Sequence, residues 1–229
     1  LSDTSASLFL DDLEMKLMNK QAELEEKQAE LEESNARFVI ETEDDLCDFL
    51  WEYAGIRIPD VQVCEHHSTP WRAFCDAYFA KSPVVVWLAS RGFGGKSFLL
   101  SLLTWAEAVT LKADANVLGA SGEQSARVLE YLTDRWAYDN APSDLLEGDT
   151  ARKTKLTYGN QIVALKASQA SVRGPHPQRL NMDEVDEMKI PILDAALGQP
   201  MEADTGIRTN IVMSSTRQYS GGTMDKMLG

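Results

Sequence analysis

An eight-residue segment, SRGFGGKS at residues 90–97, constrains this chain more than any other feature. A run of apolar and β-branched residues, PVVVWLA, precedes it, and a helix-forming stretch, FLLSLLTWAEAVTL, follows it. A buried strand, a glycine-rich turn and a helix in this order frame a phosphate-binding loop, whose usual pattern is G-x-x-x-x-G-K-[ST]. Ser90 takes the place of the first glycine, while Gly95, Lys96 and Ser97 match the end of the pattern.

The residue types of this loop suit the phosphates of a nucleotide. Glycines let the backbone wrap closely, so that its N–H groups point at phosphate oxygens, and the helix start adds a favourable dipole. Lys96 would reach the β- and γ-phosphates, Ser97 would ligate Mg²⁺, and Arg91 would add charge near the γ-phosphate. The alternative is a glycine-rich turn with a chance GKS. The expected ATP-binding residues are Ser90, Arg91, Gly92, Gly94, Gly95, Lys96 and Ser97.

A second nucleotide motif is predicted at Asp183-Glu184, which follows the short apolar stretch RLNM. Asp183 would hold Mg²⁺, and Glu184 would polarise the water that attacks the γ-phosphate. Acidic pairs at strand ends are common, but this pair comes after further strand–helix units, as the second motif should. Asp186 and Glu187 are expected in the exposed first turn of the next helix, where carboxylates suit the helix dipole.

Two further candidates concern the γ-phosphate. Ser214-Ser215-Thr216 closes another apolar strand, where a hydroxyl-rich triplet could sense the γ-phosphate and couple its loss to motion; serine and threonine are also simply common at strand ends. Arg173 lies in the loop ASVRGPHPQ and could stabilise phosphoryl charge in its own or a neighbouring subunit, with Arg179 as the competing candidate.

The rest of the chain alternates between strand and helix patterns, which predicts an α/β fold. ANVLGA and IRTNIVMSS read as core strands, EQSARVLEYLTDRWAY reads as a helix, and residues 154–167 read as a hairpin around Gly159-Asn160. We therefore expect a P-loop fold of the RecA/ASCE-like kind, with a mostly parallel sheet flanked by helices and ligands at the strands' carboxyl ends.

The N-terminal part of the chain differs in charge and pattern. Residues 1–60 carry 17 acidic and 5 basic side chains, which accounts for most of the net charge of −14. Residues 8–37 are predicted to form one long acidic helix, either a docking helix or a solvated one. The expected division is an acidic helix over 1–37, a helical lead-in over 38–82, and a P-loop ATPase core over 83–229.

The lead-in should contain two helices. The stretch ETEDDLCDFLWEYAG predicts a helix that Thr42 and Asp45 cap and Gly55 ends. A second helix is predicted from Pro70 to Ala80, with Thr69 as its N-cap. Three cysteines without a CxxC pair are typical of reduced intracellular thiols, and we see no signal peptide.

Together, four segments resemble the ATPase domain of the large terminase subunit of tailed bacteriophages, over roughly residues 60–229. They are the loop SRGFGGKS, the strand and helix VLGASGEQSARVLEYL, the stretch SVRGPHPQRLNMDE and the triplet segment MSSTRQ. The resemblance implies a Mg²⁺-dependent ATPase motor that packages double-stranded viral DNA into a procapsid. Arg91 matches the family's loop arginine, Arg173 matches the arginine proposed to act in trans, and Trp71-Arg72 fall at the adenine-side motif, where the family usually has a glutamine.

The resemblance also implies partners and a location. These are double-stranded DNA, a portal protein, a small terminase subunit and further copies in a ring, usually a pentamer, with a monomer in isolation. The protein would work in the host cell cytoplasm and transiently at the procapsid portal vertex, without a membrane. A separate nuclease domain would follow Gly229, so nuclease activity is not expected in this fragment.

Other functions stay open from the sequence. A helicase-like remodeller or a regulatory nucleotide-binding module would use the same loop, and a scaffold would use the acidic helix to recruit partners. An acidic chain is not a general nucleic-acid coating protein. Contact with DNA would therefore depend on local basic residues, for which Arg152, Lys153 and Lys155 are the candidates.

Overall fold

The computed structural model describes residues 15–26, 37–90, 95–168, 176–202, 206–218 and 220–228. The chain divides into two compact units, residues 1–40 and 41–229. In the first unit, residues 15–26 form a helix with exposed side chains, and the remainder of the helix expected over 8–37 lies outside the described residues. The division of the second unit at residue 82 stays a prediction.

Seven strands of the second unit form one sheet, in the order β1-β7-β6-β2-β5-β4-β3. The five strands from β1 to β5 in this order run parallel, and β4 and β3 continue the sheet as antiparallel strands. This confirms the predicted mostly parallel α/β fold. The strands are β1 (Val84–Leu88), β2 (Ala115–Gly119), β3 (Leu146–Thr150), β4 (Lys153–Leu156), β5 (Gln161–Lys166), β6 (Arg179–Asp183) and β7 (Asn210–Ser215).

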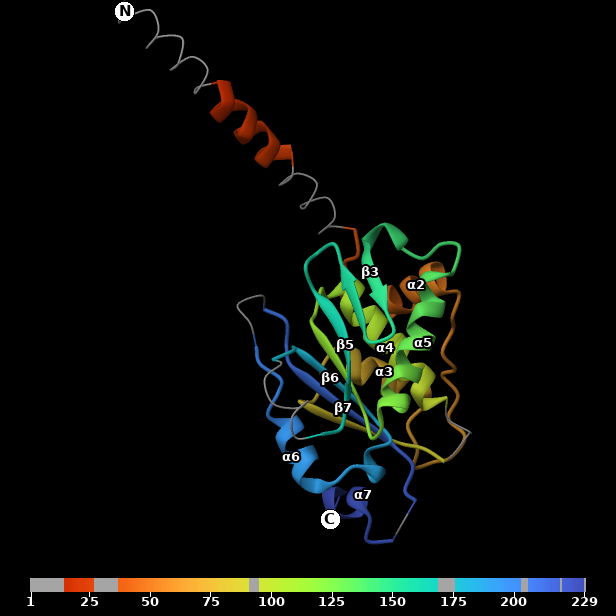
Figure 1. Cartoon of the computed structure of the whole chain (residues 1–229). Helices are drawn as coiled ribbons and strands as arrows, with labels where there is room; N and C mark the ends of the chain where they lie inside the picture. Colours follow the sequence, from red (N-terminus) through yellow and green to blue (C-terminus); the bar gives the residue numbers. More distant parts are fainter. Residues whose placement is uncertain are drawn as a thin grey trace, which may run out of the picture. The chain divides into compact units, whose positions relative to one another are not determined.

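Helices cover both faces of this sheet (Figure 1). One face of the sheet is covered by α3, α4 and α5. The other face is covered by α6. The helical elements are α2 (Glu43–Ala54), α3 (Pro70–Tyr78), α4 (Lys96–Thr110), α5 (Gly122–Trp136), η1 (Ser143–Leu145), η2 (Val185–Glu187), α6 (Ile190–Leu197) and α7 (Thr223–Leu228). No helix in the described ranges is both long and apolar enough to cross a membrane.

The helix signals in the lead-in are confirmed. Thr42 caps α2 in a capping box with Asp45, and Gly55 ends that helix in the left-handed conformation at φ 64°. Thr69 accepts the Arg72 amide at the start of α3, with Pro70 in the first turn. These caps satisfy amide groups that a helix start leaves without partners.

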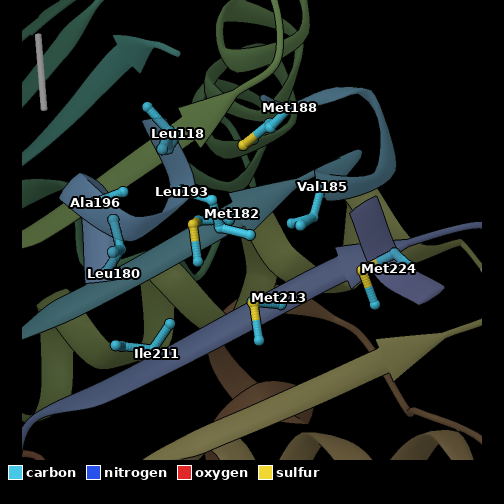
Figure 2. Packing of buried hydrophobic residues seen from close by; sticks show 10 residues of the cluster. All are labelled: Leu118, Leu180, Met182, Val185, Met188, Leu193, Ala196, Ile211, Met213 and Met224. Atoms are coloured by element: carbon cyan, nitrogen blue, oxygen red, sulfur yellow. The ribbon is translucent and has the colours of Figure 1, made fainter. Parts of the chain in front are cut away.

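The core on the α6 face is apolar and rich in methionine (Figure 2). Leu118, Met182 and Met213 of the central strands β2, β6 and β7 belong to one cluster with Leu193 of α6. Met224 of α7 joins this cluster near the end where β7 finishes. Burial of these side chains is the main favourable term that fixes the sheet against α6 and α7. The opposite face carries the polar side chains of β6, and these point toward α4.

One local expectation differs from the structure, and two elements of the structure were not expected. The segment of β1 was expected to be a buried strand, but β1 forms an edge of the sheet in the described part of the chain, and Val84 and Leu88 are exposed. The strand β3 and the helix α7 were not predicted. The sequence of β3, LEGDT, has low β-propensity because of its glycine and acids, and its pairing with β4 holds it in the sheet.

Candidate functional site

Gly95 leads into α4 at the end of the predicted phosphate-binding loop. Gly95 takes the left-handed conformation at φ 54°, which a residue without a Cβ adopts at no steric cost. It stands at the N-cap of α4, and no side chain there caps the first amides of the helix. Arg91, Gly92 and Gly94 lie outside the described residues, and Ser90 is exposed at the end of the described strand segment.

Lys96 and Ser97 bring the loop and the second motif together. The Ser97 hydroxyl donates to Oδ2 of Asp183 at 2.6 Å, although the two residues are 86 positions apart. Lys96 is buried beside the end of β1, where its ammonium donates to the Ala89 carbonyl at 3.4 Å. A hydroxyl and a carboxylate in contact at this edge are oxygen ligands of the kind that Mg²⁺ takes.

Asp183 and Glu184 stand at the carboxyl end of β6. Glu184 has a positive φ of 52°, which is uncommon for a residue with a side chain. Burial and the neighbouring Asp183 carboxylate raise the pKa of Glu184, while the Lys96 ammonium and a hydrogen bond from the Thr216 backbone oppose the rise. A carboxyl with a raised pKa is a stronger base than an ordinary glutamate, as water activation requires.

The triplet Ser214-Ser215-Thr216 lies next to this pair. In the parallel register Ser214 pairs with Asp183 on one side and with Trp87 of β1 on the other, so β7 ends between the two nucleotide motifs. Ser215 Oγ accepts the Asp186 amide at 2.9 Å. The structure therefore brings the loop, the acidic pair and the triplet to one edge of the sheet.

Several polar atoms at this edge are buried without a hydrogen-bond partner. Isolated atoms of this kind also occur elsewhere in the described part, for example Nε of Arg179 and Oδ1 of Asn181, so a single one decides little. Several such atoms at one edge carry more weight than a single one. A buried polar atom without a partner is costly unless a ligand binds it. The four atoms at this edge are Asp183 Oδ1, Glu184 Oε2, Ser214 Oγ and Thr216 Oγ1.

Asp186 was expected to be exposed, and that prediction is wrong. Its side chain is buried and accepts the backbone amides of Gln218 and Met224, both at 2.9 Å. The helix predicted from Val185 is only the short η2 turn at this point, so the position is not an open first turn. Asp186 instead joins η2 to the segment after β7, a link between distant residues that no local sequence pattern signals.

Glu187 extends the same link on the surface. Its two carboxylate oxygens accept the side-chain amides of Gln124 and Gln218, at 2.9 and 3.2 Å. Gln124 also completes the capping box of Ser121 at the start of α5. Glu187 therefore joins the start of α5, the end of η2 and the segment after β7.

Arg179 belongs to a buried network at the other end of β6. Its guanidinium lies 3.2 Å from Glu107 of α4 and donates to the Ala77 and Tyr78 carbonyls at the end of α3. Asn181 donates to Glu107 at 3.0 Å. Because the Arg179 side chain is almost fully buried among these partners, it is excluded as the arginine that reaches a neighbouring subunit. The preferred candidate, Arg173, lies outside the described residues.

The remaining candidates lie apart from this cluster. Trp71 and Arg72 are on α3; the ring of Trp71 stacks on Phe74, and no contact in the described ranges joins either residue to Lys96 or Asp183. Arg152 is exposed beside β4, and Lys153 and Lys155 lie on β4 itself. Within the described ranges, no three histidine, cysteine or acidic side chains form a group that could hold a metal ion, and the cysteines are free.

Known structures share this architecture. The crystal structure of the HK97 bacteriophage large terminase matches with a TM-score of 0.58 and 15% sequence identity, over 78% of this chain and 38% of that one. A large terminase from a thermophilic bacteriophage matches with a TM-score of 0.45 and 13% identity, over 63% of this chain and 38% of that one. No protein-family model and no curated protein matches the sequence.

The likeness to the HK97 protein establishes the fold of this chain. The predicted resemblance to large terminases is therefore confirmed at the level of the α/β fold, over most of the chain. This chain spans well under half the length of the two terminases that it matches.

Proposed function

We propose that this chain is the ATP-hydrolysing motor domain of a large-terminase-like protein that powers the packaging of double-stranded viral DNA. The observation that carries the proposal is the contact between Ser97 and Asp183, which unites the two nucleotide motifs at the edge where the parallel strands end. Nucleotides bind at this edge in open α/β sheets. The fold shared with the HK97 large terminase supports the same reading.

The residues at the edge divide the chemistry among them. Lys96 and the first amides of α4 bind the phosphates of ATP, and Ser97 and Asp183 hold Mg²⁺, which when bound neutralises charge on the β- and γ-phosphates. Glu184 orients and deprotonates the attacking water. Ser214, Ser215 and Thr216 sense the γ-phosphate, and Asp186 carries the change to the segment that ends in α7.

The proposal includes a ring of subunits. Arg173 would stabilise phosphoryl charge in a neighbouring subunit, so an isolated monomer would hydrolyse ATP slowly. The expected partners are double-stranded DNA, a portal protein and a small terminase subunit. The expected place of action is the host cell cytoplasm and, transiently, the portal vertex of the procapsid.

Steady-state ATP hydrolysis, measured against protein concentration, tests the chemistry. Wild-type activity per subunit should rise with concentration, while Glu184→Gln and Arg173→Ala alone should be inactive. A mixture of the two variants should recover activity, because each supplies what the other lacks. Full turnover by Glu184→Gln would refute the assignment of the base, and full turnover by Arg173→Ala would refute the arginine in trans.

Contact with DNA has its own test. Replacement of Arg152, Lys153 and Lys155 by alanine should weaken DNA binding by the assembled ring and flatten its dependence on salt, because each lost phosphate contact lowers the slope. The comparison is made by titration of labelled duplex at several salt concentrations. An unchanged slope would remove these three residues from the interface.

A further inference from the structure

A surface hollow of about 440 Å³ lies between α2 and the segment after α5, and the proposed function does not use it. Three of its lining residues come from α2, and two come from the segment that follows α5. The lining combines two carboxylates, two aromatic rings and an amide, from Asp48, Glu52, Trp51, Tyr138 and Asn140. Its volume falls within the range of sites that bind small ligands or peptide side chains.

The walls of the hollow are held by packing. Trp51 and Glu52 follow Asp48 by three and four positions on α2, so each is a neighbour of Asp48 on the helix surface. The opposite wall, the Tyr138 ring, packs on Gly55 so closely that a Cβ there would lie 2.9 Å from three of its atoms. The glycine that ends α2 thus also positions the ring.

The two carboxylates of the hollow lack an ion-pair partner in the part of the chain that the structure describes. Residues 41–52 contain six acidic side chains and no basic one. Glu43 pairs with Lys81 and Asp45 caps α2, but neither Asp48 nor Glu52 forms an ion pair with a residue of the described ranges. Phosphates and nucleic acid would be repelled from this surface, whereas a cationic group would be attracted.

The aromatic rings suit the same kind of ligand. Trp51 is 51% exposed and Tyr138 is 39% exposed, so both rings stay partly accessible beside their contacts with Arg57 and Gly55. The guanidinium of Arg57 already lies 4.6 Å from the centroid of the Trp51 ring, which demonstrates that this ring accepts an arginine over its face. Tryptophan and tyrosine in a hollow are also typical anchors of protein interfaces.

We infer that this hollow binds an arginine- or lysine-bearing segment of a partner protein. The cationic side chain lies over an aromatic ring and pairs with Asp48 and Glu52, and the volume leaves room for residues beside it. This inference does not depend on ATP hydrolysis at Asp183 and Glu184. It would stand if the proposed motor function failed.

The test uses the whole chain and a defined probe, the capped peptide Gly-Arg-Gly-Arg-Gly, followed by NMR of the five tryptophan indoles. The Trp51→Phe variant identifies the Trp51 signal. We expect that signal to shift on titration, with the other indoles nearly unchanged. The same peptide with citrulline in place of arginine, which keeps the shape and lacks the charge, should give no shift.

Two double variants separate a specific site from general attraction to an acidic protein. Asp48→Asn with Glu52→Gln should weaken binding about five- to ten-fold, as expected for the loss of two exposed ion pairs. Glu130→Gln with Glu147→Gln changes the net charge equally, at exposed positions outside the hollow, and should change affinity less than two-fold. Thermal unfolding of each variant shows that it is folded.

Three results would overturn the inference. One is equal weakening by both double variants, which indicates non-specific attraction. Another is a Trp51 shift on concentration of the protein without peptide, which indicates a second copy of the chain as the occupant. The third is binding of spermidine as tight as that of the arginine peptide, which indicates a site for small cations.

Discussion

The two ends of β6 differ in the balance of their buried charges. At its start, the positive Arg179 lies against the negative Glu107, so the charges balance one to one within the chain. At its end, Asp183 and Glu184 are adjacent carboxylates, and Lys96 is the cation that acts on Glu184. A balanced pair holds elements together, whereas an excess of negative charge beside uncapped amides and hydroxyls favours Mg²⁺ with a phosphate ligand.

This contrast suggests that one end of β6 supports the fold and that the other end belongs to the proposed site. The start of β6 ties together α3, α4 and the sheet through Glu107 and Arg179. The end of β6 lies where α4 begins and where Asp186 joins η2 to the last described helix. Mutations should therefore affect stability at one end and chemistry at the other.

The largest expected effect is on turnover at the end of β6. Glu184→Gln should lower the rate of ATP hydrolysis by about 10²- to 10⁴-fold, because the variant cannot take the proton of the attacking water. Its stability against urea should be unchanged or slightly higher, since a like charge next to Asp183 is removed. Asp194→Asn, at an exposed site on α6, is the matched control. A Glu184→Gln variant that loses stability but keeps its turnover would contradict the claim that this end of β6 serves the chemistry.

The largest expected effect on stability is at the start of the strand. Arg179→Ala should lower the free energy of unfolding by about 3–5 kcal/mol, because it leaves Glu107 buried without its counter-charge. Urea denaturation measures this loss. Burial already raises the pKa of Glu107, against the effect of Arg179, which is consistent with a carboxyl that depends on this partner. A loss under about 1 kcal/mol would mean that the pair does not hold these elements together.

A smaller effect is expected where Asp186 accepts two amides. Asp186→Ala should cost about 1–3 kcal/mol, the price of leaving buried donors unpaired. Hydrogen exchange should accelerate at the Gln218 and Met224 amides, both of which donate to this carboxylate. Asp186→Asn keeps one acceptor oxygen, so its free energy of unfolding should fall between those of the wild type and of Asp186→Ala. Unchanged protection of both amides would refute the assigned link.

The smallest effect is expected at the cap of α2. Thr42→Ala should cost about 1 kcal/mol, because the Asp45 amide loses its acceptor. Hydrogen bonds from the side chain and backbone of Thr42 lower the pKa of Asp45. The stability from this lowered pKa is present above the ordinary pKa of aspartate and is lost as the pH falls through the folded value. A carboxyl titration by NMR should show the Asp45 pKa closer to its ordinary value in the variant.

Local patterns allowed most of the fold to be predicted. The helices α2 and α3 follow from Thr42, Gly55 and Thr69, and the strands β1, β2 and β7 follow from apolar runs. Such features depend on neighbours in the chain, which a sequence displays directly. The edge position of β1 depends on its pairing with the distant strand β7. The strand β3 pairs with β4, which follows it directly in the chain, but the glycine and acids of its sequence, LEGDT, do not indicate a strand.

The same distinction holds within the site. The positions of Lys96, Ser97, Asp183 and Glu184 at one edge of the sheet could be predicted, because they stand where a helix begins or a strand ends. Their roles in phosphate binding and water activation stay predictions. Asp186 was misjudged, and Arg179 was kept as a competing candidate, because the roles of both residues depend on partners far away in the chain, Met224 and Glu107. A carboxylate or guanidinium looks the same in a sequence whether it is exposed or buried with a partner.

Binding of Mg²⁺ and ATP, measured as a gain in the unfolding free energy, tests the central claim most directly because it does not require hydrolysis. With ligand at about one hundred times its dissociation constant, wild type and Glu184→Gln should each gain about 2.7 kcal/mol. Lys96→Ala should gain far less at the same ligand concentration, since it lacks the phosphate-binding ammonium. No gain in Glu184→Gln, or an equal gain in Lys96→Ala, would contradict a nucleotide site at the end of β6.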